Sequence, residues 1–524
     1  MRPGCRRKFL SPARGGRLEL NSSISTAYTL RSRLIHEMLD EAAAADPDGV
    51  SVRDARGPWS YRRVVELSHA FAAWLASKGV EPGDRIIVQL PNARETVPII
   101  YGASRLGAVF VPLNPGMKAY HLRSVLEDSE PKLVIGGGKA LQETADVPVH
   151  GIDDLWSEVA AFAGGPAPDQ PAEARPEDVA VLMYTSGSTA APKAVVCPHA
   201  QVTFAASAIN AVLGYRPGDV VFCRSPMSFD YGLYQIFLSA LGHAELVMAG
   251  DGPDLALLSQ LQECGATVVP IVPSLGAMLT TLGRRAPGSA PAVRMFTSTG
   301  AALPAATIEG LRECFPGARV VRMYGVTECK RVTIMEPELD RERPDSVGRP
   351  LPGIQVLILG DDGSPLPAGE TGEIVVAGPN VMAGYWRAPE LTARVYRRDE
   401  ATGETRLHTG DYGFLDEDGY LYFEGRRDDM FKRKGTRMST TEIEAAAMDI
   451  PGIRAAAVLP PGDGHDLAIL VEGDLAPHAV LRELAQRLEP AKVPAVCRVL
   501  PFFPLTLNGK NERKELVRFL DESP

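Results

Sequence analysis

A run of hydroxyl and glycine residues that ends in a lysine is the part of this sequence best suited to bind phosphate. Its members are Thr185, Ser186, Gly187, Ser188, Thr189 and Lys193. Backbone N–H groups and short hydroxyls can converge on anionic oxygens, and the lysine adds a positive charge, so a triphosphate is the expected ligand. The run lacks the glycine spacing of a Walker A sequence, and a solvated Ser/Thr loop is the alternative interpretation.

Three downstream motifs could complete a nucleotide site. Thr327 and Glu328 follow an expected strand, so they lie at its carboxyl end, where open parallel sheets place their ligands. Their hydroxyl and carboxylate could hold a Mg²⁺ that bridges phosphates. Asp411 lies on a turn and could accept hydrogen bonds from a ribose, and Lys510 is presented by another turn. Each of them, taken singly, also fits an ordinary solvated surface residue.

The pattern around these motifs predicts alternating strands and helices. An apolar run, Val179–Met183, reads as a buried strand that leads into the phosphate-binding run. Helical periodicity over 30–45 and 64–75 alternates with strand patterns over 85–90 and 109–113. Such alternation indicates βαβ units and a largely parallel, covered sheet.

The second half of the chain repeats this alternation and then changes in character. The expected strands lie near 220–223, 246–248, 267–272, 295–296 and 320–323, with a helix over Leu257–Cys264. Short strands with Gly/Pro/Asp turns begin near Gly353 and suggest an antiparallel section. About a hundred residues after the charged turn at 425–429 form their own strand–helix alternation, an ordinary size for a small domain.

The predicted fold class is therefore α/β. A large N-terminal domain consists of two α/β subdomains plus a small β section, and a small mobile C-terminal α+β domain follows. The predicted boundaries are a disordered tail over 1–27, an N-terminal core domain over 28–427 and a C-terminal lid domain over 428–524.

Composition excludes several classes of partner. The 524 residues carry a formal charge of −10, which argues against attraction to nucleic acid or to an anionic membrane. No window approaches 18 uninterrupted apolar residues, so no membrane span is expected. The seven cysteines are odd in number and contain no Cys-x-x-Cys pair, which favours a reducing, cytoplasmic location.

In this order and spacing, the motifs resemble those of the adenylate-forming superfamily of acyl- and aryl-CoA synthetases, luciferases and nonribosomal-peptide adenylation domains. The resemblance extends to Arg105–Pro115, Gly372–Tyr385 and Gly425–Asp428, and it covers nearly the whole chain from about residue 30.

The resemblance implies a role for each matched residue. It makes Thr185–Thr189 with Lys193 the phosphate loop. Gly300, Ala301 and Ala302 would form a shelf beside adenine, and Tyr324 and Gly325 would be further adenine contacts. Thr327 and Glu328 would be the phosphate and Mg²⁺ ligands, Asp411 and Arg426 the ribose contacts, Asp428 a hinge, and Lys510 the lysine of the first half-reaction. The implied chemistry is attack of a carboxylate on the α-phosphate of ATP, followed by transfer of the acyl group to a thiol. One departure is alanine at Ala190 and Ala194, where many relatives have glycine, so the loop could turn differently.

Two further features indicate what is activated. Asp230 follows Phe229 as in amino-acid-activating domains, where the aspartate pairs with the substrate ammonium; the alternative is a helix N-cap. Lys330 and Arg331 follow Glu328, and they could hold a second substrate carboxylate or form a surface pair in water.

One ammonium site and one carboxylate site beside the reacting carboxylate predict an acidic amino acid. This combination resembles the standalone amino-acid-adenylating enzymes of macrolactam polyketide pathways, most closely those that activate 3-methylaspartate. The resemblance implies that the β-carboxyl is activated, that Lys330 and Arg331 hold the α-carboxylate, and that Thr299 sets the room for a methyl branch. Aspartate and 3-methylaspartate both remain candidates, since a missing methyl costs only about 1–3 kcal/mol of discrimination.

No carrier-protein motif is found in the sequence, so the acceptor thiol is expected on a separate carrier protein or on coenzyme A. The rival predictions are an acyl- or aryl-CoA ligase, in which Asp230, Lys330 and Arg331 are structural, and a non-catalytic nucleotide-binding protein.

Overall fold

Two largely parallel sheets, each covered by helices on both faces, form the larger part of the structure. The computed structural model describes residues 33–164, 174–185, 192–250, 252, 254–286, 292–337, 339–426, 430–433, 436–461, 465–488, 490, 492–503, 516 and 518–521. All statements about the structure concern these residues. None of the helices in this part of the chain is long and apolar enough to cross a membrane.

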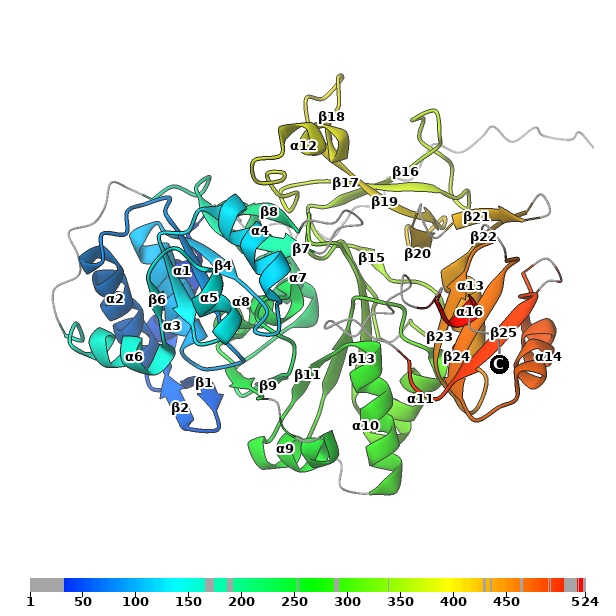
Figure 1. Cartoon of the computed structure of the whole chain (residues 1–524), viewed down its shortest axis with the longest axis horizontal. Helices are drawn as coiled ribbons and strands as arrows, with labels where there is room; N and C mark the ends of the chain where they lie inside the picture. Colours follow the sequence, from blue (N-terminus) through cyan, green and yellow to red (C-terminus); the bar gives the residue numbers. More distant parts are fainter. Residues whose placement is uncertain are drawn as a thin grey trace, which may run out of the picture. The chain divides into compact units, whose positions relative to one another are not determined.

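The first sheet has the strand order β6-β5-β3-β4-β7-β8. Its strands are β3 (Arg85–Gln89), β4 (Val109–Pro112), β5 (Leu133–Gly136), β6 (Val149–His150), β7 (Val179–Thr185) and β8 (Lys193–Pro198). Its helices are α2 (Tyr61–Ser77), α3 (Thr96–Leu106), α4 (Ala119–Ser129), α5 (Lys139–Thr144) and α6 (Ile152–Ala160). Helices α2, α3 and α6 pack on one face, and α4 and α5 pack on the other (Figure 1).

Helix α2 shows how the sequence sets these elements. It begins where the Ser60 hydroxyl accepts a hydrogen bond from the Arg63 N–H, as an N-cap does. Its predicted apolar face, which includes Phe71 and Leu75, is buried. The following helix, α3, ends at Gly107 with φ +79°, a conformation that glycine adopts without strain.

The second sheet has the order β15-β14-β13-β12-β11-β9-β10-β1-β2. Its strands are β1 (Val50–Asp54), β2 (Gly57–Ser60), β9 (Val220–Cys223), β10 (Glu245–Met248), β11 (Val268–Ile271), β12 (Met295–Ser298), β13 (Arg319–Tyr324), β14 (Thr333–Ile334) and β15 (Arg349–Pro350). Helices α9 (Leu257–Cys264), α10 (Pro273–Arg285) and α11 (Ala305–Cys314) pack on one face, and α7 (His199–Leu213) and α8 (Asp230–Gly242) pack on the other. The predicted alternation is confirmed for both sheets.

Within these two sheets, the antiparallel pairs occur where no helix separates two strands. Strands β7 and β8 form a hairpin, with Thr185 opposite Lys193. The predicted phosphate-binding run therefore joins two antiparallel strands, although the sequence pattern predicts no strand after it. Strands β14 and β15 also pair antiparallel and extend the second sheet beyond β13.

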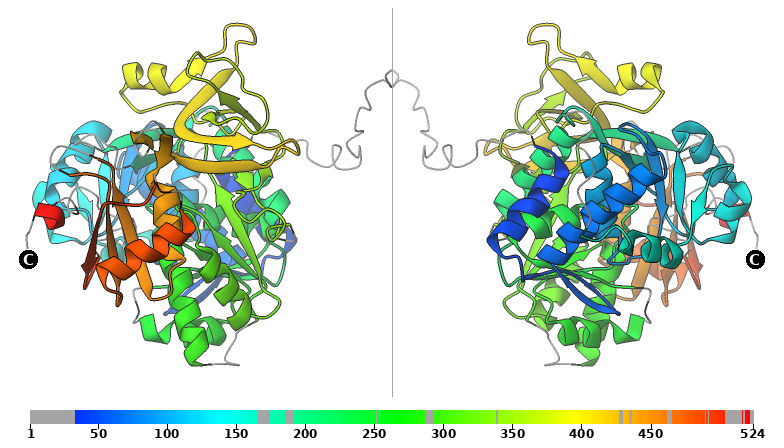
Figure 2. Two further views of the ribbon diagram at one scale, coloured as in Figure 1. Left: turned by 90° about the vertical axis from the view of Figure 1, so that its right-hand side faces the viewer. Right: turned by 90° about the vertical axis from the view of Figure 1, so that its left-hand side faces the viewer.

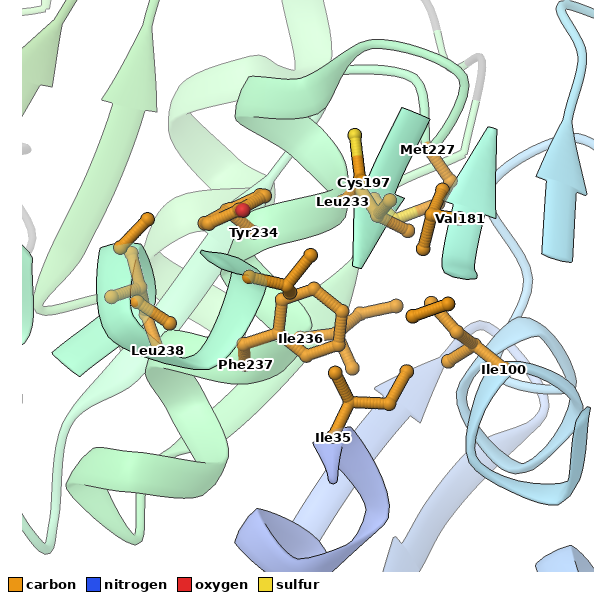
Figure 3. Close-up of a cluster of buried hydrophobic side chains, with 14 of the residues drawn as sticks. Ile35, Ile100, Val181, Cys197, Met227, Leu233, Tyr234, Ile236, Phe237 and Leu238 are labelled. Atoms are coloured by element: carbon orange, nitrogen blue, oxygen red, sulfur yellow. The ribbon is translucent and has the colours of Figure 1, made fainter. Parts of the chain in front are cut away.

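Helix α8 lies in the largest hydrophobic core, which includes residues from both sheets. Nearly all of its side chains are buried. Figure 3 shows Leu233, Tyr234 and Phe237 of this helix among side chains from other elements, including Ile35 of α1 (Ile35–Ala45) and Cys197 of β8. A helix packed on all sides holds its first residue, Asp230, in a fixed place.

A third sheet and two short strands follow. The third sheet is antiparallel, as the Gly/Pro/Asp turns predict, and contains β16 (Gln355–Leu359), β17 (Gly372–Ala377), β18 (Tyr396–Arg398), β19 (Thr405–Leu415) and β20 (Leu421–Arg426). Helix α12 (Pro389–Val395) precedes β18, and β21 (Met430–Arg433) pairs with β22 (Thr436–Ser439).

The C-terminal residues form a core of their own. Strands β23 (Ile453–Leu459), β24 (Ala468–Gly473) and β25 (Val496–Leu500) make one sheet, and α13 (Thr440–Met448) and α14 (Pro477–Arg487) lie together on one face of it (Figure 2). The short helix α16 (Arg518–Asp521) follows β25. The predicted boundary at 427/428 and the predicted tail over 1–27 lie outside the described residues, so both stay predictions.

The buried His199 and the half-buried His36 link α1 to the core and make stability pH-dependent. His199 Nδ1 accepts a hydrogen bond from the Ile35 N–H at 3.2 Å, and His36 Nδ1 lies 2.9 Å from Ser104 Oγ. Burial lowers the pKa of both histidines to about 4, with smaller contributions from Arg105 at His36 and from His36 at His199. Because each pKa is lowered on folding, the stabilisation is complete above pH 6.5 and is lost as the pH falls towards 4.

We therefore expect the free energy of unfolding to drop by about 2–4 kcal/mol between pH 7.5 and pH 5, measured by urea denaturation. The matched variant is His199→Gln, whose amide oxygen can accept the Ile35 N–H bond without titrating. In His199→Gln the free energy of unfolding should depend less on pH than in the wild type. An unchanged slope in this variant would contradict the assignment to His199.

Candidate active site

Asp230 is the first residue of α8, and its carboxylate is buried. Phe229 is the N-cap residue, and no side chain caps this helix. The carboxylate of Asp230, 4% exposed, instead lies 3.5 Å from Nη1 of Arg331. The helix N-terminus favours a negative charge at this position. The alternative prediction, that Asp230 is only a helix N-cap, is therefore wrong.

Lys330 and Arg331 are also buried, with exposed fractions of 1% and 6%. A tight turn after β13 places them there. The Lys330 N–H bonds to the Val326 carbonyl at 2.7 Å, and Lys330 has φ +63°, which is uncommon for a residue other than glycine. A Cβ atom at Gly325 would lie 1.7 Å from the Lys330 carbonyl oxygen, so this turn requires glycine. The alternative of a surface pair in water is wrong.

The three charged side chains line one small cavity. Its other lining residues are Ile209, Leu213, Tyr231, Tyr234, Gln235, Leu238 and Met323. The two cations lie against aromatic rings, Arg331 at 5.1 Å from the Tyr231 ring centre and Lys330 Nζ at 5.7 Å from that of Tyr234. One carboxylate and two cations leave this buried cluster with a net charge of +1, which favours an anionic ligand.

The hydroxyl of Tyr234 supports a polar ligand in this cavity. It is buried and has no hydrogen-bond partner among the described residues. A buried polar group is normally hydrogen-bonded. Thr299, the expected determinant of room for a methyl group, is buried after β12 but is not among the residues that line the cavity.

The predicted adenine and ribose contacts lie together. Tyr324, at the end of β13, donates a hydrogen bond from its hydroxyl to Asp411 Oδ2 at 2.7 Å. Arg426 Nε lies 3.2 Å from Asp411 Oδ1, because Asp411 of β19 is directly opposite Arg426 of β20. Burial raises the pKa of Asp411, and the Arg426 guanidinium opposes that rise. The shelf residues Gly300, Ala301 and Ala302 are exposed, and Gly300 has φ +92°.

On the phosphate side, the structure describes only part of the predicted set. Ser186, Gly187, Ser188, Thr189, Ala190, Asp428 and Lys510 lie outside the described residues. Thr185 and Lys193 face each other across the β7–β8 hairpin. Ala194 is a buried β8 residue paired with Tyr184, and its φ is not positive, so this position does not require glycine.

Sequence reasoning missed the contact that fixes Glu328. The Tyr385 hydroxyl donates a hydrogen bond to Glu328 Oε1 at 2.7 Å, which leaves the second carboxylate oxygen available. Burial and the Glu328 charge raise the pKa of Tyr385 well above its usual range. No group of three or more His, Cys, Asp or Glu side chains in the described part of the chain could hold a metal ion. The oxygens of Glu328 and Thr327 suit Mg²⁺, which commonly takes one or two carboxylates together with substrate phosphates.

Comparison with known proteins identifies the family. The model of the AMP-binding enzyme family matches residues 39–386. This chain belongs to the AMP-binding enzymes. The predicted resemblance to the adenylate-forming superfamily, whose members include AMP-forming ligases, is confirmed.

Among solved structures, VinN is 57% identical with a TM-score of 0.71, covering 75% of this chain and 99% of VinN. Two further structures are VinN complexes with L-aspartate and with 3-methylaspartate. ATP-bound MatB from Rhodopseudomonas palustris is 26% identical with a TM-score of 0.82, covering 94% and 99% of the two chains.

Curated sequences give the same family at lower identity. Enterobactin synthase component F of Escherichia coli (strain K12) is 30% identical over 517 residues, which is 94% of this chain and 40% of the synthase. The delta-poly-L-ornithine synthetase of Acinetobacter baumannii (strain AB307-0294) is also 30% identical, over 93% of this chain and 37% of the synthetase. This chain therefore spans about two-fifths of these relatives.

Proposed function

We propose that this enzyme activates an acidic amino acid, aspartate or 3-methylaspartate, at its β-carboxyl group. The observation that carries the proposal is the cavity lined by Asp230, Lys330 and Arg331. An acidic amino acid has a net charge of −1 and would offset the +1 of this cluster. The VinN complexes with L-aspartate and 3-methylaspartate support the same substrate class.

Each charged residue then has one role. Asp230 binds the substrate ammonium, and Lys330 and Arg331 bind the α-carboxylate. Substrate binding must separate Asp230 from Arg331, which are 3.5 Å apart, and must give each a new partner of opposite charge. The reacting β-carboxylate is then directed away from this cluster, towards the nucleotide.

The first step is the attack of this carboxylate on the α-phosphate of ATP, which yields aminoacyl-AMP and pyrophosphate. A carboxylate needs no base, so the protein contributes positioning and the neutralisation of developing charge. Lys510 supplies a positive charge, and Thr185 with Lys193 belongs to the loop that holds the leaving pyrophosphate. Asp411 and Arg426 bind the ribose, and Tyr324 binds the adenine. A Mg²⁺ ion held by Glu328 and Thr327 would neutralise phosphate charge.

The second step is transfer of the aminoacyl group to the phosphopantetheine thiol of a separate carrier protein, in macrolactam polyketide biosynthesis. The family type and the similarity to nonribosomal peptide synthetases support a carrier as the acceptor. Coenzyme A is the alternative acceptor.

ATP–pyrophosphate exchange tests the proposal. We expect exchange with L-aspartate and with 3-methylaspartate, and none with benzoic or fatty acids. Exchange with plain acids alone would make the enzyme an acyl- or aryl-CoA ligase. ATP binding without exchange by any acid would indicate a non-catalytic nucleotide-binding protein.

Arg331→Ala should raise the KM for aspartate about 10- to 100-fold, because it removes a charged hydrogen bond and leaves Asp230 buried without its partner. The KM for ATP should change by less than about threefold, since no nucleotide group is expected in this cavity. Exchange kinetics at varied aspartate and ATP measure both constants. Equal rises in both would contradict a role in binding the acid.

A further inference from the structure

Lys330 is a buried cation whose described partners are all neutral. Its ammonium nitrogen lies 3.5 Å from Cys197 Sγ and 5.7 Å from the Tyr234 ring centre. No ion pair joins Lys330 to any carboxylate in the described part of the chain, since Asp230 pairs with Arg331. This arrangement is unusual, because buried charges are normally paired with opposite charges.

Cys197 lies on β8, in the same buried cluster as Tyr234 of α8 (Figure 3). Its thiol is placed to donate its proton to the Val195 carbonyl at 3.5 Å and to accept a hydrogen bond from Lys330. A thiol can do both at once, as a weak donor and a weak acceptor. Burial raises the pKa of Cys197, which outweighs the opposing effect of the ammonium and keeps the thiol neutral.

A neutral acceptor fixes the position of Lys330 without cancelling its charge. A carboxylate in the place of Cys197 would form an ion pair with the lysine and would leave it little attraction for a substrate anion. A purely apolar residue would leave the ammonium without a hydrogen bond before the substrate binds.

We propose that Cys197 is a positioning residue, which holds Lys330 as an uncompensated cation for the second carboxylate of the substrate. This inference rests on the proposed function, because it concerns how the acid-binding lysine is held. Cys197 itself contacts Lys330 and takes no part in the chemical step.

The test compares two substrates in ATP–pyrophosphate exchange with the full chain. L-Aspartate carries the second carboxylate, whereas 3-aminobutyrate has a methyl group in its place. The readout is the ratio of kcat/KM for aspartate to that for 3-aminobutyrate. This ratio does not depend on how much of a variant is folded, so a merely structural effect would not change it.

Cys197→Ala should lower this ratio about 5- to 20-fold, mainly through the KM for aspartate, with the KM for ATP unchanged. Cys197→Ser keeps a neutral acceptor and should stay within about threefold of the wild type. The matched control is Cys329→Ala, which removes the same atom from a fully buried cysteine whose side chain makes no hydrogen bond to Lys330. If Cys197→Ala does not fold, Cys197→Val removes the acceptor while filling the space, with the same expected result.

Lys330→Met separates the failure of this inference from the failure of the proposed function. If Lys330→Met lowers the ratio but Cys197→Ala and Cys197→Val do not, the positioning role is wrong and the acidic substrate stands. If Lys330→Met and Arg331→Ala both leave the ratio unchanged, the proposed acid-binding site is wrong. Isothermal titration of each variant with L-aspartate in the absence of ATP should rank the variants by affinity in the same order as the kcat/KM ratio does.

Discussion

Asp230→Asn should lower kcat/KM for aspartate about 10²- to 10³-fold in ATP–pyrophosphate exchange. Asparagine keeps the shape but removes the only carboxylate among the residues that line the cavity. The substrate ammonium would then enter a buried site that already contains Lys330 and Arg331, with no negative charge opposite it. Breaking a buried pair of charges costs about 3–5 kcal/mol, and the lower part of this range corresponds to the expected loss.

The same substitution should favour an acid that lacks the ammonium. In the wild type Asp230 pairs with Arg331, so a dicarboxylate such as succinate must displace Asp230 from Arg331 and leave the aspartate unpaired. In Asp230→Asn this obstacle is absent, and the ratio of succinate to aspartate activity should rise at least about tenfold. An equal loss of exchange activity with succinate and with aspartate would contradict the role of Asp230 in binding the ammonium.

Asp219→Asn is the matched control for Asp230→Asn. Asp219 is equally buried, at 3% exposed, and its Oδ2 pairs with Arg294 Nη2 at 2.5 Å just before β9. It does not line the cavity. Its substitution should lower the free energy of unfolding but leave the KM for aspartate within about twofold of the wild type.

The sequence predicts the layered α/β fold well, because periodic apolar residues decide which segments form helices and strands. The expected helix Leu257–Cys264 is α9 with the same bounds, and the eight strands expected in the two sheets differ from the observed bounds by at most two residues at either end. Strands β1, β2, β5, β6, β8, β14 and β15 of the same sheets were not predicted. The β7–β8 hairpin was missed. A turn of hydroxyl and glycine residues is compatible with several connections, and only the pairing of Thr185 with Lys193 identifies a hairpin.

The sequence also predicts the charged residues of the site, but it cannot predict how they are held. Asp230, Lys330 and Arg331 were identified by type and motif. Burial then excluded a surface pair for Lys330 and Arg331, and the N-cap position of Phe229 excluded a capping role for Asp230. No sequence motif identifies Cys197 and Tyr385, which hold Lys330 and Glu328, because each lies far along the chain from the residue it contacts. Tyr234 could have been identified, since it lies four residues after Asp230 on the same face of a helix.

Strand β8 shows why these supports matter for function. It begins at Lys193, in the predicted phosphate loop, and it also carries Cys197, which contacts Lys330 of the acid cavity. Its middle exchanges backbone hydrogen bonds with the segment around Tyr385, whose hydroxyl fixes Glu328. One short strand therefore connects the predicted phosphate, metal and acid sites, so their relative positions depend on a rigid hydrogen-bonded element.

Lys510→Ala should reduce ATP–pyrophosphate exchange with aspartate about 10²- to 10³-fold while the protein stays folded. Lys510 lies outside the described residues, and its role follows from the family motif alone. The reason is electrostatic: negative charge develops on the α-phosphate as the carboxylate attacks, and one well-placed charged donor contributes about 2.7–4 kcal/mol to such a step. The KM for aspartate should change little, because the acid cavity contains its own cations.

The second half-reaction gives the sharper form of this test. Supplied with preformed aspartyl-AMP and an acceptor thiol, Lys510→Ala should form thioester at close to the wild-type rate. The thiol attacks the acyl carbon and AMP leaves with the acyl–oxygen bond, so no bond to the α-phosphorus forms or breaks in this step. Lys492→Ala, which removes a lysine that pairs with Glu442 at 2.7 Å, is the matched control and should leave both half-reactions unchanged. Equal losses in both half-reactions of Lys510→Ala would indicate a structural role. An unaffected first half-reaction would show that the charge is supplied by another residue. Lys193, in the predicted phosphate loop, is then the first residue to replace.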